Sequence, residues 1–189
     1  MINISTRNVP DTLLGHPDLK RQVDRHFSRF NSPWFDRAQR SIICLHEATH
    51  VVYARMLGFN PRLYGPSVDF DPDSEKFRRL DASVESLPYE IGMDADPVLI
   101  AKYHMGPAYV EAKLLSHRTW EEIWADAQGD LAICNKWAVE RERVRGDYLL
   151  SVAKTKTFLR DEVYRDCRSP AFRRKLWEAA REFEARVFS

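Results

Sequence analysis

The segment CLHEATHVV, at Cys44–Val52, holds the residues of this 189-residue sequence that are best suited to chemistry. His46 and His50 stand one helical turn apart, and Glu47 directly follows the first histidine. At about 100° per residue on a helix, the three side chains project within one quarter-turn. Two imidazoles one turn apart can bind the same zinc ion, while the adjacent carboxylate reaches the ion's bound water and can take its proton.

The surroundings of this motif predict a long buried helix. Ser32 is a suitable N-cap, Pro33 fits the first helical position, and Gly58 is a natural C-cap. The alternative interpretation is a pair of buried histidines bonded to backbone groups, with a glutamate in an ion pair. Unpaired polar groups are costly on a buried helix, and a bound cation satisfies all three side chains together. The rest of this helix is apolar, at Ile42, Ile43, Leu45, Val51, Val52, Tyr53 and Met56.

A hydrolytic zinc site usually has three protein ligands, so a third must come from elsewhere in the chain. The extended metzincin pattern is absent, because Tyr53 and Met56 occupy its glycine and third-histidine positions. Glu111 lies in an apolar helical segment and is a candidate ligand or second-shell partner. Asp130 leads an apolar stripe, but an aspartate after a glycine is also a common N-cap, and without the upstream motif the cap would be favoured.

The remaining sequence predicts an α+β, mainly α-helical fold. RLYGPSVDF, at residues 62–70, reads as a strand, and the charged stretch after it can carry a second one, giving a small β ribbon. Gly106-Pro107 is expected to break or restart a helix. TWEE, at residues 119–122, matches a capping box. Helices are expected near 18–30, from Asp130 after an interruption at Gly129, near 147–165 and at 170–187, the last with an apolar stripe suited to a core or an interface.

Composition sets the broad class of the protein. The 29 basic and 28 acidic residues leave a net charge of +1, so nothing indicates a nucleic-acid partner. Three widely spaced cysteines without a C-x-x-C argue against a disulfide framework and favour a reducing compartment. No stretch approaches the ~20 apolar residues of a membrane helix, and the N-terminus does not look like a signal peptide. The expectation is a cytoplasmic protein without a membrane partner, and its oligomeric state is left open.

Three segments resemble, in the same order, the peptidase domain of FtsH-type zinc proteases. These are LHEATHVVYARMLGF, MGPAYVEAKLL and AQGDLAICNKWA, within residues 38–140. The resemblance implies that His46 and His50 are zinc ligands, that Glu47 is the general base, and that Asp130 is the third ligand. Glu111 would then take a supporting role. Thr49 replaces the glycine usual in the family's signature, a change that costs only tenths of a kcal/mol relative to alanine in a helix.

The sequence also lacks a P-loop pattern and a membrane anchor, so we expect a stand-alone, ATP-independent metallopeptidase. The expected organisation is a single domain over residues 1–189, with an N-terminal arm and helix (1–31), a metallopeptidase core (32–145) and a helical extension (146–189). The expected activity is that of an endopeptidase acting on a protein or peptide with Zn²⁺ as cofactor. An oxyanion stabiliser is also needed, and His104, His117, Tyr53 and Tyr103 are candidates. The alternative is a zinc-binding regulatory or interaction protein with a non-catalytic, peptidase-like fold, in which Cys44, Cys134 or Glu111 closes the metal site.

Overall fold

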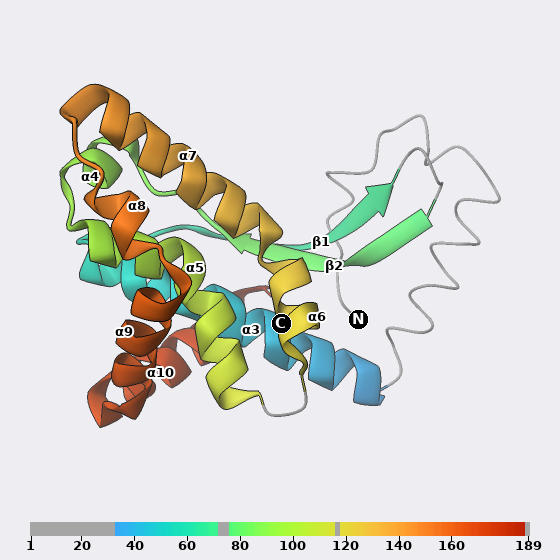
Figure 1. The fold of residues 1–189 in the computed structure, drawn as a ribbon. Helices are drawn as coiled ribbons and strands as arrows, with labels where there is room; N and C mark the ends of the chain where they lie inside the picture. The colour runs from blue at the N-terminus through green and yellow to red at the C-terminus, as the bar shows by residue number, and fades with distance from the viewer. Residues whose placement is uncertain (1–32, 72–75, 116–117, 188–189) are drawn as a thin grey trace.

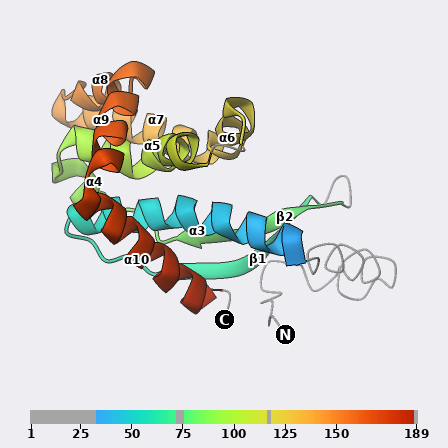
Figure 2. The same ribbon diagram turned by 90° about the horizontal axis from the view of Figure 1, so that it is seen from below.

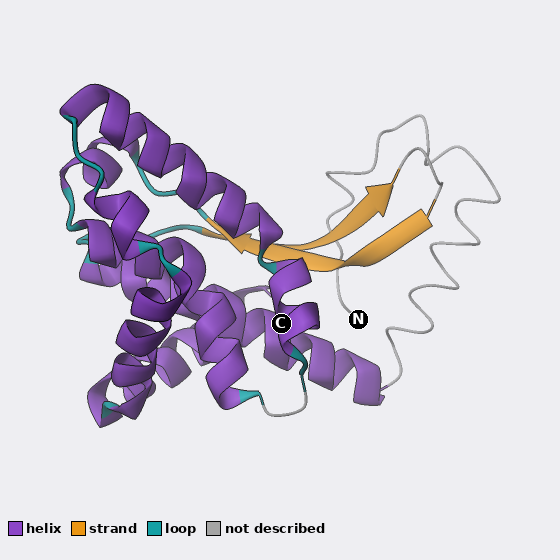
Figure 3. Cartoon of the chain, viewed as in Figure 1, coloured by secondary structure: helices purple, strands orange, loops and turns teal. Residues whose placement is uncertain are grey.

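The computed structural model describes residues 33–71, 76–115 and 118–187 (Figures 1 and 3). The described part is mainly helical with one two-stranded antiparallel sheet, which confirms the α+β, mainly α-helical fold class. None of its helices combines the length and apolar character that a membrane crossing requires. The elements, in chain order, are α3 (Pro33–Met56), β1 (Leu63–Asp71), β2 (Lys76–Val84), α4 (Tyr89–Asp94), α5 (Pro97–Leu114), α6 (Trp120–Asp126), α7 (Gln128–Arg145), α8 (Leu149–Ala153), α9 (Lys156–Arg168) and α10 (Pro170–Val187). The helix expected near 18–30 lies outside the described residues.

Helix α3 is the element around which the others pack. It begins at Pro33, as the sequence predicts, and Gly58 ends it with a left-handed φ of 78°. The amide of Phe59 then donates back to the carbonyl of Ala54, which closes the helix end. Figure 2 shows α3 between α10 and the β ribbon on one side and the layer of α5, α6 and α7 on the other. An apolar helix covered on several sides holds its few polar side chains in a buried setting.

The β ribbon is present where the sequence predicts it. Strand β1 pairs antiparallel with β2, with Leu63 opposite Val84, and the register shifts twice along the pair. Gly65 lies at one of these shifts with φ 124°, and a Cβ there would come within 2.8 Å of the Ala82 Cβ. Strand β2 packs against α3 and β1 against α10. The ribbon therefore forms a wall beside the polar residues of α3.

The C-terminal helices complete the core. The predicted stripe of α10 is buried and contributes to the main core, which contains Phe172, Leu176, Ala179, Phe183 and Val187. The single helix expected near 147–165 is instead two helices, α8 and α9, because Thr155 is extended (ψ 136°) and its carbonyl accepts the Leu159 amide as α9 begins. Helix α9 is joined to α5 by the buried Lys102, whose ammonium contacts Asp166 at 2.9 Å and Glu162 at 3.2 Å.

The predicted break at Gly106-Pro107 is wrong. Helix α5 continues from Pro97 to Leu114 with Pro107 in its interior, and its residues are buried without interruption from Ile100 to Glu111. A proline inside a helix costs about 3 kcal/mol. Burial of about two helical turns before it and about one turn after it outweighs that cost, since each large apolar side chain contributes about 1.5–3 kcal/mol.

Gly106 allows α5 to lie close to α3, and we expect Gly106→Ala to destabilise the protein. A Cβ at this position would lie 2.6 Å from Cε2 of the fully buried Tyr53 ring. The overpacking cost of about 1–3 kcal/mol should exceed the gain of up to about 1 kcal/mol in helix propensity. Urea denaturation measures the difference. Gly129→Ala is the control, because within residues 33–71, 76–115 and 118–187 no atom outside its own helical backbone and chain neighbours lies within 4 Å of the added Cβ, and it should leave stability unchanged or raise it.

Candidate metal centre

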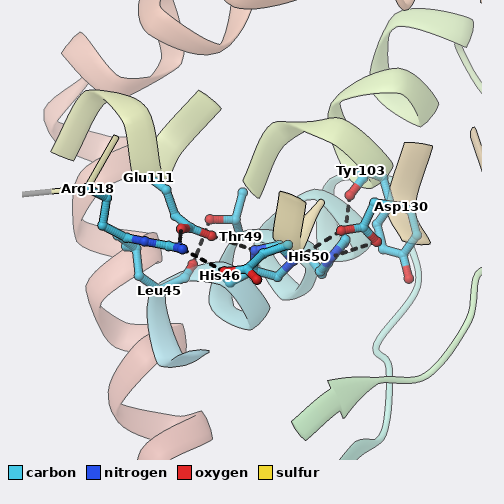
Figure 4. Close-up of polar contacts among 9 residues, drawn as sticks. Leu45, His46, Thr49, His50, Tyr103, Glu111, Arg118 and Asp130 are labelled. Atoms are coloured by element: carbon cyan, nitrogen blue, oxygen red, sulfur yellow. Dashed lines mark hydrogen bonds and ion pairs between the residues drawn. The ribbon is translucent and has the colours of Figure 1, made fainter. Parts of the chain in front are cut away.

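His46, His50 and Asp130 come together between α3 and α7, although Asp130 is 84 residues from His46 in the sequence (Figure 4). Each offers one ligand atom, and these atoms all lie within 4.8 Å of one another. Nε2 of His46 is 3.1 Å from Asp130 Oδ2, and Nε2 of His50 is 3.5 Å from Asp130 Oδ1. The two imidazole rings are 5.1 Å apart at 64°. We call these three residues the metal triad.

Asp130 is not an N-cap. Helix α7 begins at Gln128, Ala127 holds the N-cap position, and no side chain makes a capping hydrogen bond there. The helix start expected at Asp130, after an interruption at Gly129, is therefore two residues too late. One turn into the helix, the Asp130 carboxylate turns instead toward both histidines of α3.

Helix α5 holds the other nitrogen of each histidine. Nδ1 of His46 donates to Glu111 Oε1 at 2.6 Å, and Nδ1 of His50 donates to the main-chain carbonyl of Tyr103 at 2.7 Å. Because a carbonyl only accepts, Nδ1 of His50 must carry the proton, which leaves Nε2 as the nitrogen for a metal. Metal-binding histidines in proteins are oriented in this way by carboxylates or backbone carbonyls.

Glu111 contacts His46 and is not part of the metal triad. Its side chain is 1% exposed, and its second oxygen accepts from Arg118 at 2.5 Å. Arg118 also contacts Asp126 at 2.6 Å, so its guanidinium lies between two carboxylates (Figure 4 shows the contact with Glu111). The buried charge of Glu111 is therefore compensated on one side by Arg118 and bonded on the other to His46.

We expect Glu111→Gln to weaken zinc binding by about 10–100-fold, the usual effect of losing an outer-shell partner of a ligand. Glutamine keeps the shape of the side chain but removes the charge that makes His46 a stronger ligand. Competition with a chromogenic chelator measures the dissociation constant. Glu140→Gln on α7 is the control, because its carboxylate pairs with Arg143 at the surface. Equal zinc affinities for the two variants would contradict the supporting role of Glu111.

Two members of the metal triad, His46 and Asp130, are charged before any metal binds. Burial disfavours the charge of Asp130, but the neighbouring His50 and His46 outweigh it and hold the pKa of Asp130 well below its usual range. Burial likewise lowers the pKa of His46, yet hydrogen bonds to Asp130 and Glu111 raise it well above 6.5 overall. His46 is therefore an imidazolium bonded at both nitrogens. A metal ion must displace the proton on Nε2, so metal binding releases a proton.

A cavity of about 430 Å³ opens over the metal triad. Glu47 lies in its lining beside the triad and is 9% exposed. Helix α7 contributes Ile133 and Trp137 beside Asp130, and Asp126 comes from the end of α6. The end of β2 and the loop after it contribute Ala82, Ser83, Val84, Ser86 and Leu87. The volume falls within the range of small-ligand pockets. The cavity therefore has the Glu47 carboxylate and the metal triad at one wall.

The structure separates the candidates for an oxyanion stabiliser. Tyr53 is buried in the core and its hydroxyl donates to Asp166, away from the metal triad. His117 lies outside the described residues. Tyr103 lines the cavity and donates its hydroxyl to the Glu85 carbonyl at 3.0 Å. Burial and the charges of Glu47 and Asp130 raise the pKa of this phenol, so it remains a donor.

His104 also lines the cavity, and its buried Nε2 has no hydrogen-bond partner among the described residues.

Two further groups contribute to the site but cannot be identified from sequence motifs, the Arg118 side chain and the Tyr103 carbonyl. Arg118 has no local signal, because its role depends on a carboxylate seven residues earlier in a different element. The Tyr103 carbonyl has one signal, Pro107, whose missing N–H leaves the carbonyl four residues earlier without its helical donor.

No protein-family model matches this chain, and neither a curated protein nor a solved structure matches it significantly. The similarity to FtsH-type peptidases rests on the three sequence segments and stays a prediction. A proposal about function therefore rests on the residues of the site.

Proposed function

We propose that this protein is a zinc-dependent metallopeptidase that cleaves peptide bonds without ATP. One observation carries the proposal: His46, His50 and Asp130 place ligand atoms within 4.8 Å of one another in the wall of a cavity that Glu47 also lines. The HExxH motif on α3 supplies two of the ligands and the base that zinc hydrolysis needs, and the Asp130 carboxylate on α7 supplies the third ligand.

The donor set suits zinc. Two imidazole nitrogens and one carboxylate oxygen are ligands that zinc accepts, and both histidines have their Nδ1 atoms occupied so that Nε2 can bind the ion. Among the described residues, Cys44, Cys134 and Glu111 do not join the group that could hold an ion. Three protein ligands are typical of catalytic zinc sites, whereas structural sites have four. This count favours hydrolysis over the regulatory, non-catalytic alternative.

The chain's own residues have distinct roles in the proposed reaction. When bound, zinc supplies a Lewis acid that polarises a peptide carbonyl and lowers the pKa of a coordinated water to ~7. Glu47, which follows His46 and lines the cavity, would accept a proton from the attacking water and return it to the leaving amine. Tyr103 has a protonated hydroxyl at the cavity wall, and it would have to exchange its hydrogen bond to the Glu85 carbonyl for one to the substrate carbonyl oxygen as negative charge develops there. The cavity holds the extended substrate segment.

The test combines metal content with cleavage. Protein purified without chelators should contain about one zinc per chain and should degrade an unfolded protein such as casein. His46→Ala should lose both properties, while Met56→Ala, an exposed change on the same helix, should lose neither. A metal-free protein under zinc-replete conditions would exclude the metal site. A zinc-loaded protein that cleaves no protein or peptide would leave the structural-zinc alternative.

A further inference from the structure

We propose that Pro107 is a positioning residue for the metal site, which it serves by freeing the Tyr103 carbonyl to hold His50. The inference rests on the proposed function only in taking His50 as a zinc ligand. It concerns a residue that touches neither metal nor substrate and that is unfavourable where it stands. Pro107 is buried in the interior of α5, the helical position that tolerates proline least.

The geometry of a helix connects Pro107 to Tyr103. In an uninterrupted helix, the carbonyl of residue 103 accepts the amide N–H of residue 107. Proline has no N–H, and its ring also crowds the carbonyl four residues earlier. The Tyr103 carbonyl therefore lacks the N–H donor that residue 107 would otherwise supply. A buried carbonyl without a donor needs another partner.

That partner is His50. Its Nδ1 donates to the Tyr103 carbonyl at 2.7 Å, and both residues are buried (Figure 4). The Tyr103 ring also lies edge-on to the His50 ring, with centroids 5.2 Å apart. The hydrogen bond fixes the tautomer of His50 with the proton on Nδ1 and turns Nε2 toward Asp130, 3.5 Å away.

The residue before the proline makes this contact possible. Gly106 has no side chain, and the space where its Cβ would lie is filled by the Tyr53 ring of α3. Helices α3 and α5 therefore approach each other closely near the Tyr103 carbonyl. His46 is held from the same helix by the side chain of Glu111, at 2.6 Å. Helix α5 therefore orients both histidines of α3, one through a carboxylate and the other through a main-chain oxygen that Pro107 leaves available.

Pro107→Ala tests the proposal because its expected effects on stability and on metal binding differ in sign. Alanine restores the helical N–H and is the best helix former, so the urea midpoint of the metal-free protein should be unchanged or higher. Zinc affinity, measured by chelator competition, should fall about 10–100-fold. Pro97→Ala is the matched control, because Pro97 occupies the first turn of the same helix, where an amide has no helical partner. Its zinc affinity should equal that of the unmodified protein.

A chemical variant separates the missing donor from a loss of packing. Lactic acid at position 107 gives an ester, which has the methyl group of alanine but no N–H. This protein should bind zinc more tightly than Pro107→Ala and close to the unmodified chain. If Pro107→Ala and the ester lose zinc affinity equally, or if affinity and stability fall together in Pro107→Ala, the residue is structural and the proposal is wrong.

The tautomer of His50 gives a readout that needs no metal. Long-range ¹H–¹⁵N spectra of the metal-free protein should show His50 protonated at Nδ1, and Pro107→Ala should shift His50 toward a mixture of tautomers. An unchanged tautomer in Pro107→Ala contradicts the inference. If the unmodified protein binds no zinc at all, the proposed function fails, and this spectrum still decides the role of Pro107.

Discussion

Glu47→Gln should lower the rate of peptide hydrolysis by about 10²–10⁴-fold while the protein keeps its zinc, because the loss of a general base removes proton transfer without removing a ligand. Glu47 lines the cavity next to His46 and His50 but does not belong to the metal triad. Glutamine has nearly the same shape and accepts hydrogen bonds, but it cannot take a proton at neutral pH. Steady-state cleavage of a fluorogenic peptide and zinc analysis of the same sample measure the two effects.

Two comparisons make this result decisive. Asp130→Ala should lose zinc and cleavage together, since it removes a predicted ligand from the triad. Glu140→Gln, an identical chemical change at a surface ion pair, should alter neither. A Glu47→Gln protein that retains full activity with bound zinc would refute the proposed mechanism, and a protein that loses zinc would assign Glu47 to the metal site instead.

Acidification should destabilise the folded protein through His104, by about 3 kcal/mol between pH 7 and pH 4. Burial, with a smaller contribution from His50, lowers the pKa of His104 from 6.5 to about 3 in the folded protein. In that pH range the unfolded chain takes up a proton that the folded chain does not bind. Stability therefore rises with pH between the two pKa values and is lost as pH falls below 6.5.

The measurement is urea unfolding of metal-free protein at pH 7 and pH 4, compared with His104→Leu. Leucine fills a similar volume, does not titrate, and removes the buried Nε2 that has no hydrogen-bond partner in the described part of the chain. The variant should lose less stability than the unmodified protein over this range, while the contribution of the other titrating groups is common to both. Equal losses in the two proteins would show that His104 takes up its proton without unfolding.

Local chemistry made the central helix predictable. The apolar pattern around His46, Glu47 and His50, with Pro33 before it and Gly58 after it, identifies α3 and the face on which its polar residues lie. Such a helix depends on contacts between residues three and four apart, which the sequence displays directly. The capping box at Thr119 and the buried stripe of α10 were predictable for the same reason.

The contacts between residues distant in the sequence became evident only from the tertiary structure. Asp130 had a local interpretation as an N-cap, and only the packing of α7 against α5 brings it to the histidines, 84 residues away in the case of His46. Glu111 had two possible roles, and only the structure reveals its contacts with His46 and Arg118, on which the proposed supporting role rests. Pro107 was expected to break a helix, but the burial of α5 outweighs the local cost of the proline. The sequence by itself determined the residues that can bind a metal from one helix. The tertiary structure decided which distant groups complete and orient that site, because such contacts arise from packing energies that no local pattern records.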